Sequence, residues 1–275
     1  MAEANILISN TKDATIEARA RLAALGIAIL AEDDDVIAVA KPAGMVTHPA
    51  YRHPDGTLTD AVFAYACQCG AARPWLLHRL DRETSGAVLF ARSERARRAL
   101  VRQIEQRRVT KRYLTVLAGT LPAATGEITA PLCRDPADRR RVIVSPAGKP
   151  AITRYRLLAE RDGYALALVE PLTGRTHQIR AHLASQGAPL AGDATYGGAS
   201  DTTRAVGIKR TLLHAWDLAF RHPATGERQT IRAPLPLDMR DALAALGLSS
   251  GMTADEAGLG AGLLEPAWSD HVSGC

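Results

Sequence analysis

The sequence predicts an α+β fold, because segments typical of strands and helices follow one another without a regular β-α-β alternation. Apolar residues make up 47% of the 275 residues and charged residues 23%, which is typical of a globular protein rather than a disordered one. A chain of this length can bury a large core without disulfides or metals. Aromatic residues make up only 4%, so we expect aliphatic and alanine side chains to fill the core.

The first half of the chain predicts two helices, a strand hairpin and a buried strand before a third, arginine-rich helix. In order, these are a helix over 13–25 stopped by Gly26, strands over 27–30 and 36–40 around the acidic turn 32–35, a helix over 59–68, and a strand over 87–91. The Pro and Gly in residues 41–44 end the second strand. Ser93 is expected to cap a helix that runs through Arg108, because Ala96, Leu100 and Ile104 share one face.

The second half predicts mostly strands. We expect strands over 113–117 and 164–169, short strands and turns within 126–156, a strand pair over 212–220 and 229–233 around the turn 223–226, and a short helix over 240–246. Another helix is expected from Thr176, as its cap, to Gln186, where Gly187 and Pro189 end it.

The chain divides into a short N-terminal extension over 1–28, a main domain over 29–248, and an acidic, Gly-rich tail over 249–275 that we expect to be disordered. The apolar stretches are too short to span a bilayer, and the N-terminus lacks a signal peptide, which predicts a cytoplasmic protein without membrane association. The four cysteines are Cys67, Cys69, Cys133 and Cys275, and their spacing favours reduced thiols over disulfides or a metal site.

Positive charge is concentrated in one segment. The chain carries a net charge of +5, while the tail after residue 248 holds four acidic residues and no Lys or Arg, so the rest of the chain carries +9. The window from Arg92 to Arg112 contains nine basic residues opposed only by Glu94 and Glu105, and residues 139–141 are three further arginines. Such clusters attract nucleic acid, although an arginine-rich helix face can also be merely solvated.

Several common catalytic motifs are absent from the sequence. There is no phosphate-binding G-x-x-x-x-G-K-[ST], no H-E-x-x-H, no G-x-G-x-x-G between a strand and a helix, and no G-x-S-x-G. These absences argue against nucleotide hydrolysis, zinc proteolysis, dinucleotide redox chemistry and ordinary esterase chemistry.

Two polar segments contain the candidate catalytic residues. Residues 78–86, HRLDRETSG, precede the apolar strand 87–91, and Asp81 lies among arginines that favour an ionised carboxylate. A structural ion pair is the alternative interpretation of Asp81. Residues 174–183, GRTHQIRAHL, contain His177 and His182 five positions apart, which is not the helical spacing of metal ligands, so we predict hydrogen-bonded histidines and no metal.

These segments resemble the RluA-type pseudouridine synthase family. The resemblance includes HRLDRETSG at 78–86, KPAGMVTHP at 41–49, Lys111 and Tyr113 followed by Gly119, residues 174–183, the motif from Gly187 to Gly197, and LHA at 213–215, all in the family's order. It covers about residues 29–236. Many relatives carry an N-terminal S4 domain, and the 28 residues before this region are too few for one, so RNA selection is expected to rest on the catalytic domain.

The resemblance implies an isomerase that converts specific uridines in ribosomal or transfer RNA to pseudouridine, without cofactor or metal. It implies a bent, mainly antiparallel mixed sheet flanked by helices, with a central catalytic cleft. It also implies Asp81 as the catalytic carboxylate, which either attacks C1′ or removes a sugar proton, with Tyr113 against the target base and Arg180 paired to Asp81. Arg79 would replace the flipped base in the RNA stack. The further expected RNA contacts are His78, Lys41, Lys111, Arg175 and His177.

Two other classes of function remain as alternatives. A catalytically silent RNA-binding protein or RNA chaperone would share the scaffold, but it would not need Asp81, Tyr113 and Arg180 together. A nuclease or nucleosidase would need a water-activating base or a metal, for which we find no motif. RNA is the expected partner, no protein partner is implied, and we expect a monomer.

Overall fold

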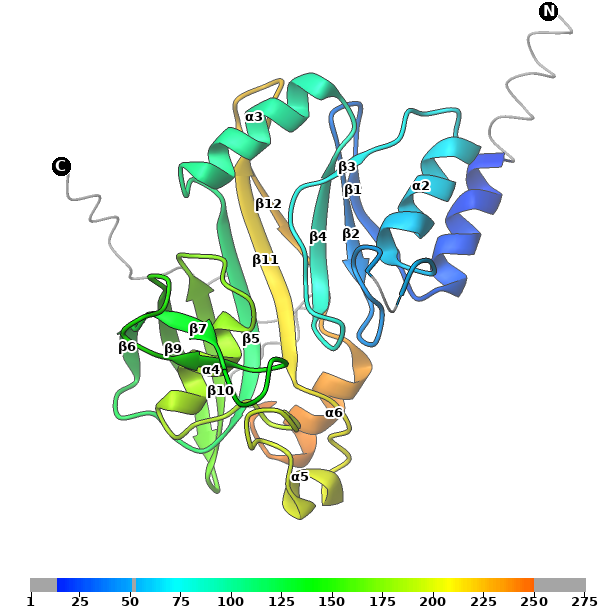
Figure 1. Ribbon diagram of the computed structural model, residues 1–275. Coiled ribbons are helices and arrows are strands. Elements are labelled where there is room, and N and C mark those ends of the chain that lie inside the picture. Colours follow the sequence, from blue (N-terminus) through cyan, green and yellow to red (C-terminus); the bar gives the residue numbers. More distant parts are fainter. Residues whose placement is uncertain (1–13, 51–52, 250–275) are drawn as a thin grey trace, which may run out of the picture.

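A ten-stranded, mainly antiparallel sheet forms the centre of the molecule (Figure 1). The computed structural model describes residues 14–50 and 53–249. The strands follow one another across the sheet in the order β1 (Ala28–Glu32), β2 (Val36–Lys41), β4 (Ser85–Ala91), β11 (Leu213–Arg221), β5 (Thr110–Ala118), β10 (Tyr164–Pro171), β9 (Ile152–Arg161) and β6 (Thr125–Thr129). Strand β12 (Arg228–Arg232) pairs with β11, and the short β3 (Trp75–Leu76) pairs with β4.

One junction in this sheet is parallel. Strands β4 and β11 run in the same direction where His214 pairs with Ser85 and Ala215 with Gly86, whereas the other pairings among the described strands are antiparallel. All seven residues of β4 are buried, because core clusters cover both faces of this strand. The segment that contains Asp81 therefore leads directly into the most buried strand of the sheet.

Helices pack on the two faces and at the ends of the sheet (Figure 1). They comprise a helix over 14–24, α2 (Leu58–Gln68), α3 (Glu94–Glu105), α4 (Gln178–Ser185), α5 (Asp201–Ala205) and α6 (Leu237–Ala245). A separate ribbon of β7 (Leu132–Arg134) and β8 (Val142–Val144) lies beside α4. The predicted α+β class with a mainly antiparallel sheet and flanking helices is confirmed.

Local sequence signals explain where several helices begin. Thr57 and Asp60 form a capping box at the start of α2, and the Ser93 hydroxyl accepts a hydrogen bond from the Ala96 amide at the start of α3, as predicted. The helix over 14–24 buries Ala18 and Leu22 in the main core. None of the described helices has the length and apolar character needed to cross a bilayer.

Some predicted boundaries are wrong. Helix α3 ends at Glu105 instead of Arg108, because Arg107 adopts a positive φ of 56° and turns the chain into β5. Thr176 does not cap α4: the N-cap is His177, which has a left-handed backbone and no side-chain capping bond. Strand β9 continues to Arg161, helix α6 begins already at Leu237, and neither β3 nor α5 was predicted. Most of the predicted tail and the first thirteen residues lie outside the described part of the chain.

Candidate active site

The loop that carries Asp81 is fixed by hydrogen bonds to its backbone on both sides of the carboxylate. The Thr47 hydroxyl donates to the Leu80 carbonyl at 2.7 Å and accepts from the Leu80 amide at 3.2 Å. On the other side, Lys41 Nζ donates to the Arg82 carbonyl and Arg210 Nη1 to the Glu83 carbonyl, both at 3.1 Å. These bonds hold the backbone around Asp81 in one conformation before any substrate binds.

The loop rests against β11 through a glycine. Gly86 has a φ of 118°, and a Cβ atom at this position would lie 2.2 Å from the Ala215 carbonyl oxygen. Only glycine permits both the backbone conformation and this close approach. Beside it, the Ser85 hydroxyl donates to His214 Nδ1 at 2.9 Å, while His214 Nε2 donates to the Ala233 carbonyl at 3.1 Å.

The opposite wall of the site is the segment that leads into α4, and Gln178 holds it in place. The Gln178 side-chain oxygen accepts from the Thr173 hydroxyl at 2.7 Å and from the Arg175 amide at 3.0 Å. Its amide nitrogen donates to the Ile152 carbonyl and to the Thr153 hydroxyl oxygen on β9. Gln178 is buried, so four satisfied hydrogen bonds attach the 173–175 loop to the sheet.

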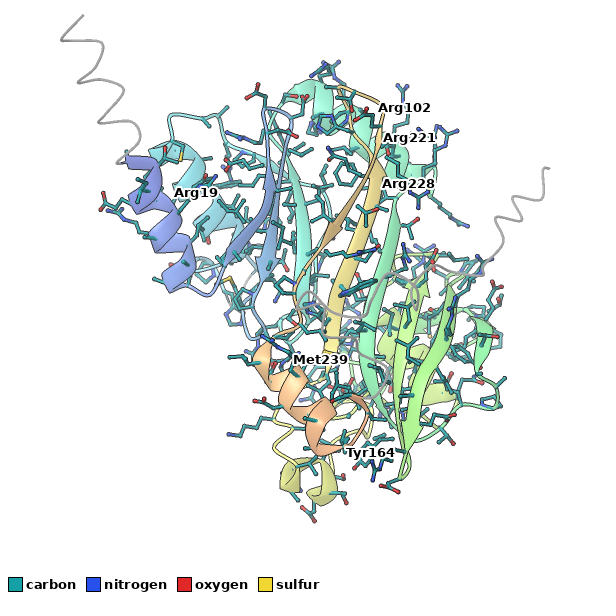
Figure 2. The ribbon with its side chains drawn as sticks, turned by 180° about the vertical axis from the view of Figure 1, so that it is seen from behind. Arg19, Arg102, Tyr164, Arg221, Arg228 and Met239 are labelled. Carbon is teal, nitrogen blue, oxygen red and sulfur yellow. The ribbon has the colours of Figure 1, made fainter. Side chains whose placement is uncertain are left out.

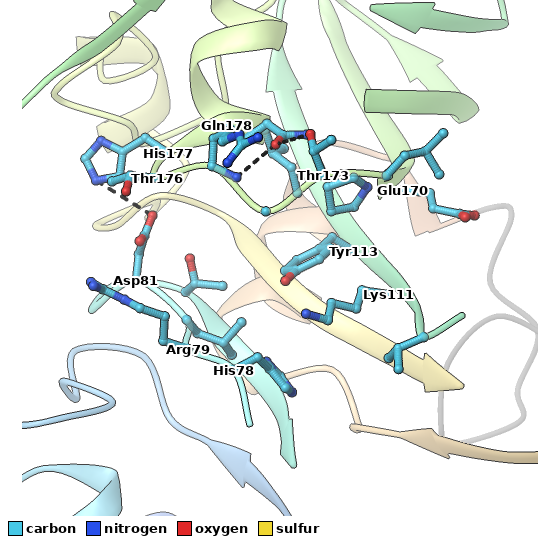
Figure 3. A pocket seen from close by; sticks show the side chains of 18 of the residues that line it. His78, Arg79, Asp81, Lys111, Tyr113, Glu170, Thr173, Thr176, His177 and Gln178 are labelled. Carbon is cyan, nitrogen blue, oxygen red and sulfur yellow. Dashed lines mark hydrogen bonds and ion pairs between the residues drawn. The ribbon is translucent and has the colours of Figure 1, made fainter. Parts of the chain in front are cut away.

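Two side chains from this wall approach the Asp81 carboxylate. Arg180 Nη1 lies 3.6 Å and His177 Nε2 lies 3.7 Å from Asp81 Oδ2. In Figure 3 the Asp81 carboxylate points toward the His177 ring, and a dashed line marks their contact. The Asp81 side chain is 25% exposed, so the carboxylate remains accessible from the cavity while a guanidinium lies beside it.

Arg180 is oriented by a second carboxylate. Its Nε and Nη2 donate to Asp193 at 2.6 and 2.9 Å, and the Asp193 side chain is fully buried. Asp193 also accepts from the amides of Thr195 and Tyr196. Burial lowers the pKa of Arg180, but hydrogen bonding and charge from Asp193 outweigh burial and raise that pKa above its ordinary value, so the guanidinium stays charged.

His177 connects Asp81 to Tyr196. Its Nδ1 lies 3.2 Å from the Tyr196 hydroxyl, which itself donates to the Val142 carbonyl and accepts from the Val142 amide. The histidine adopts a left-handed backbone with a φ of 51°, which turns its ring toward the cavity. Burial lowers the pKa of His177 below its ordinary value, and the negative charge of Asp81 opposes this effect.

Strand β5 provides the floor of the cavity with Lys111 and Tyr113, which point in the same direction because they are two residues apart on a strand (Figure 3). Burial lowers the pKa of Lys111. Burial and the nearby charge of Asp81 raise the pKa of Tyr113, so its phenol is neutral in the folded protein. His78 completes this side: its Nε2 accepts from the Leu89 amide at 3.2 Å, and burial lowers the His78 pKa well below its ordinary value.

These elements surround a cavity of about 670 Å³. Eight of the nine predicted site residues line it: His78, Arg79, Asp81, Lys111, Tyr113, Arg175, His177 and Arg180. A volume of this size accommodates a nucleotide-sized group. Within the described residues, no cluster of three or more His, Cys, Asp or Glu side chains is placed to hold a metal ion.

Comparison with known proteins assigns the family. Residues 35–185, which include Asp81, Tyr113 and Arg180, match the family described as RNA pseudouridylate synthase. The chain belongs to the RNA pseudouridylate synthase family. It is 46% identical over 203 residues to an uncharacterized RNA pseudouridine synthase of Chloroflexus aurantiacus, with 73% of this chain and 63% of that protein covered. It is also 40% identical over 237 residues to ribosomal large subunit pseudouridine synthase D of Xanthomonas campestris, with 82% and 71% covered. The chain thus spans about two thirds of the length of these relatives.

Solved structures of RNA pseudouridylate synthases share the fold. The structure titled human RNA pseudouridylate synthase domain containing 4 superposes with a TM-score of 0.69 at 23% identity, covering 86% of this chain and 97% of that one. The structure titled human RNA pseudouridylate synthase domain containing 1 gives a TM-score of 0.63 at 28% identity, covering 76% and 84%. The first of these supports the shared fold alone.

One predicted site residue of this synthase lies elsewhere. Lys41 is 1% exposed, and its ammonium donates to the carbonyls of Pro42, Met45 and Arg82 beneath the catalytic loop. Burial lowers the pKa of Lys41 to about 7. The expectation that Lys41 contacts RNA is therefore corrected, because backbone carbonyls enclose its charged end and the residue does not line the cavity.

Sequence reasoning gave no role to two residues that organise the synthase site. Asp193 orients Arg180, and Gln178 attaches the 173–175 loop to β9. Both lie within the motifs that carried the family resemblance. The partner that matters for Asp193, Arg180, is 13 residues away along the chain, and Gln178 also bonds to β9, more than twenty residues before it. The position of Asp193 directly after Gly192, within a motif of the family, indicated a functional residue. Nothing in the neighbouring sequence identifies Arg180 as its partner. His182, by contrast, is the hydrogen-bonded structural residue that was predicted, bonded to Thr153 and the Ala130 carbonyl.

Proposed function

We propose that this protein isomerises uridine to pseudouridine in RNA of the large ribosomal subunit. Family membership supports the reaction, and relatives at 35 to 42% identity carry the name ribosomal large subunit pseudouridine synthase D, which supports this RNA class. The observation that carries the proposal is the accessible Asp81 carboxylate, which lies beside Arg180 in a cavity that also contains Tyr113.

The reaction is balanced without an external reagent. The bond between N1 of the base and C1′ of the ribose breaks, the base turns, and a bond forms between C5 and C1′. The proton at C5 is lost and N1 gains one, so no water or oxidant is consumed. One carboxylate is enough to act at the sugar, in contrast to glycoside hydrolysis, which usually needs two.

Each residue around the cavity has a role in this proposal. Asp81 acts on the ribose, and Arg180 places a positive charge beside the carboxylate. Tyr113 lies against the base as a neutral phenol, which can relay the C5 proton to solvent by accepting that proton while it releases its own. Arg79, which is exposed at the cavity mouth, fills the space that the flipped uridine leaves in the RNA stack. His78, Lys111, Arg175 and His177 line the path of the RNA. The catalytic domain spans 29–248, and the enzyme acts as a cytoplasmic monomer.

The proposal is tested by tritium release from RNA that carries [5-³H]uridine. Unmodified large-subunit ribosomal RNA and transfer RNA are each incubated with the wild type, with Asp81→Asn, and with Asp201→Asn as a control for an exposed carboxylate on α5. We expect release from ribosomal RNA by the wild type and the control, and none by Asp81→Asn. Release by Asp81→Asn would remove Asp81 as the catalytic residue. Release from transfer RNA alone would overturn the ribosomal assignment, and absence of release from both would favour the silent RNA-binding alternative.

A further inference from the structure

Ion pairs occupy five of the nine basic residues in the segment from Arg92 to Arg112. Arg92 contacts Glu32, Arg95 contacts Asp35, and both Arg97 and Arg98 contact Glu94. Arg112 is buried against Asp217, and Lys111 lies in the cavity. Three arginines of the segment remain exposed without a carboxylate in ion-pair distance among the described residues: Arg102, Arg107 and Arg108.

The fold adds two arginines to these three. The last pair of the β11–β12 hairpin is Arg221 opposite Arg228, and both side chains are exposed. Gln103 on α3 joins the helix to this hairpin, because its side chain donates to the Arg221 carbonyl and accepts from the Arg221 amide, both at 2.8 Å. Figure 2 shows Arg102, Arg221 and Arg228 gathered at one end of the molecule. We call Arg102, Arg107, Arg108, Arg221 and Arg228 the arginine surface.

The sheet register places three of these residues in a row. Thr110 of β5 pairs with Ala219 of β11, so Arg108 and Arg221, each two residues beyond that pair, emerge at the same edge. Arg228 follows on the neighbouring strand. Arg108 precedes the first residue of β5 by two positions. Because adjacent strands are about 4.8 Å apart, the backbones of these three residues lie near one another at this end of the sheet.

This arrangement is costly for the isolated protein. Like charges directly opposite each other across a strand pair destabilise a hairpin. The acidic residues nearest in sequence, Glu105 and Glu227, form no ion pair with the arginine surface in the described structure. Anions that bind between these side chains would relieve the repulsion.

The arginine surface is continuous with the cavity. Arg107, together with Ile104 and Glu105 at the end of α3, lines the cavity rim, and Arg108 follows it toward the hairpin. Residues 98–108 and 221–232 contain no Phe, Tyr or Trp to stack an unpaired base, and His222 is buried beside Asp33. Guanidinium groups bind phosphate oxygens through charge-assisted hydrogen bonds, and such contacts make up a large share of those to nucleic acid.

We infer that the arginine surface binds the phosphate backbone of an RNA helix that flanks the target uridine. The flipped nucleotide then enters the cavity past Arg107, while the adjoining stem lies along α3 and the hairpin tip. The inference rests on the proposed function, since the cavity at one end of the surface is the one that accepts the uridine. It identifies a structured stem, in addition to the target loop, as part of what the enzyme binds.

The test compares two variants with the same change in net charge. The surface variant is Arg102→Gln/Arg221→Gln/Arg228→Gln. The control is Arg21→Gln/Arg161→Gln/Arg204→Gln, which neutralises exposed arginines that pair with Glu17, Asp162 and Asp201 elsewhere on the molecule. Fluorescence anisotropy measures the affinity for a labelled RNA hairpin with a uridine-containing loop, and for a single strand of the loop sequence, over a series of salt concentrations.

We expect the surface variant to bind the hairpin about tenfold more weakly than the wild type. The slope of log affinity against log salt concentration should fall by an amount that corresponds to about two to three phosphate contacts. The control variant should resemble the wild type in both measurements. Affinity for the single strand should change much less. The inference would be overturned if both variants lost the same affinity for the hairpin, or if the surface variant lost the same affinity for the hairpin and the single strand. It would also be overturned if polyglutamate competed as effectively as RNA. The assay needs no turnover, so a selective loss of hairpin binding would support the stem surface even if tritium release failed for the wild type.

Discussion

Arg180 donates two hydrogen bonds to Asp193, at 2.6 and 2.9 Å, and offers Asp81 only a longer contact of 3.6 Å. Asp193 is fully buried, so the guanidinium is oriented from within the protein and not by Asp81. Asp81 thereby gains a fixed positive neighbour without losing its access to the cavity. This arrangement makes Asp193 the residue on which the geometry of the site depends.

Replacing Asp193 with Asn should reduce kcat about 10- to 100-fold, because the amide group cannot accept both Arg180 bonds and the guanidinium shifts relative to Asp81. Breaking a buried ion pair should also lower the free energy of unfolding by about 3–5 kcal/mol. Single-turnover tritium release and urea denaturation measure the two effects. Asp201→Asn, which breaks an exposed pair with Arg204, is the matched control and should change neither. An unaltered kcat in folded Asp193→Asn would show that Arg180 needs no second carboxylate.

A second prediction concerns the close approach of β4 and β11. Gly86→Ala places a methyl group 2.2 Å from the Ala215 carbonyl oxygen at a φ of 118°, so the parallel junction must separate. We expect a loss of more than about 3 kcal/mol in the free energy of unfolding. Gly44→Ala is the control, since Gly44 also has a positive φ but no atom within 4 Å of the added Cβ, and it should lose only about 1 kcal/mol. Similar losses in both variants, measured by urea denaturation, would refute the steric explanation.

These two cases show which part of the site could be predicted from sequence. The motif around Asp81, the alternation that places Lys111 beside Tyr113, and the Ser93 cap all follow from neighbouring residues. The contact of Gly86 with Ala215 joins residues more than a hundred positions apart, and the sequence contains no local sign of it.

Ion pairing was harder to predict than helix position. The helix around Arg92–Arg108 was expected nearly where α3 lies, but only Glu94 and Glu105 within the segment were counted against its positive charge. Glu32 and Asp35, which pair with Arg92 and Arg95, come from the β1–β2 hairpin. Conversely, Arg221 and Arg228 join the surface only because the sheet brings their hairpin to α3. Charge along a sequence therefore indicates an RNA-binding protein, while the fold decides which arginines are available.

Stability should fall in mild acid because of His214. The ring accepts from Ser85 at Nδ1 and donates to Ala233 at Nε2, an arrangement that requires the neutral form, and burial lowers the pKa of His214 to about 4. The unfolded chain binds this proton near pH 6.5, so the stability that the neutral ring provides is complete above pH 6.5 and is lost as the pH falls through 4. The shift in pKa corresponds to about 3 kcal/mol in the free energy of unfolding.

Urea denaturation at pH 7, 5.5 and 4 measures this effect. The free energy of unfolding should depend less on pH in His214→Gln than in the wild type, whereas His53→Gln, at an exposed site, should follow the wild type. Parallel curves for all three proteins would contradict this assignment.

The Tyr113 hydroxyl should contribute to catalysis without contributing to RNA binding. Tyr113→Phe keeps the ring that lies in the cavity and removes only the oxygen, so we expect kcat to fall about 100-fold while the affinity for RNA changes less than about twofold. Tyr155→Phe is the control, because Tyr155 is a buried tyrosine of the same core on β9 and does not line the cavity, and its kcat should stay at the wild-type value.

The pH profile separates two ways in which the phenol could act. Burial and the charge of Asp81 both raise the pKa of Tyr113, so ionisation would place a second negative charge beside a carboxylate in a poorly hydrated cavity. The phenol therefore takes part as a neutral group. We expect the rate of single-turnover tritium release by the wild type to stay level between pH 7 and 10, apart from any change that Tyr113→Phe shows as well. A rise in rate over that range in the wild type, absent from the variant, would mean that the phenolate is the active form and that bound RNA changes the electrostatics of the cavity. A flat profile with a uniformly slower variant would instead show that Tyr113 acts through its hydroxyl hydrogen bond, with Asp81 as the charged group of the reaction.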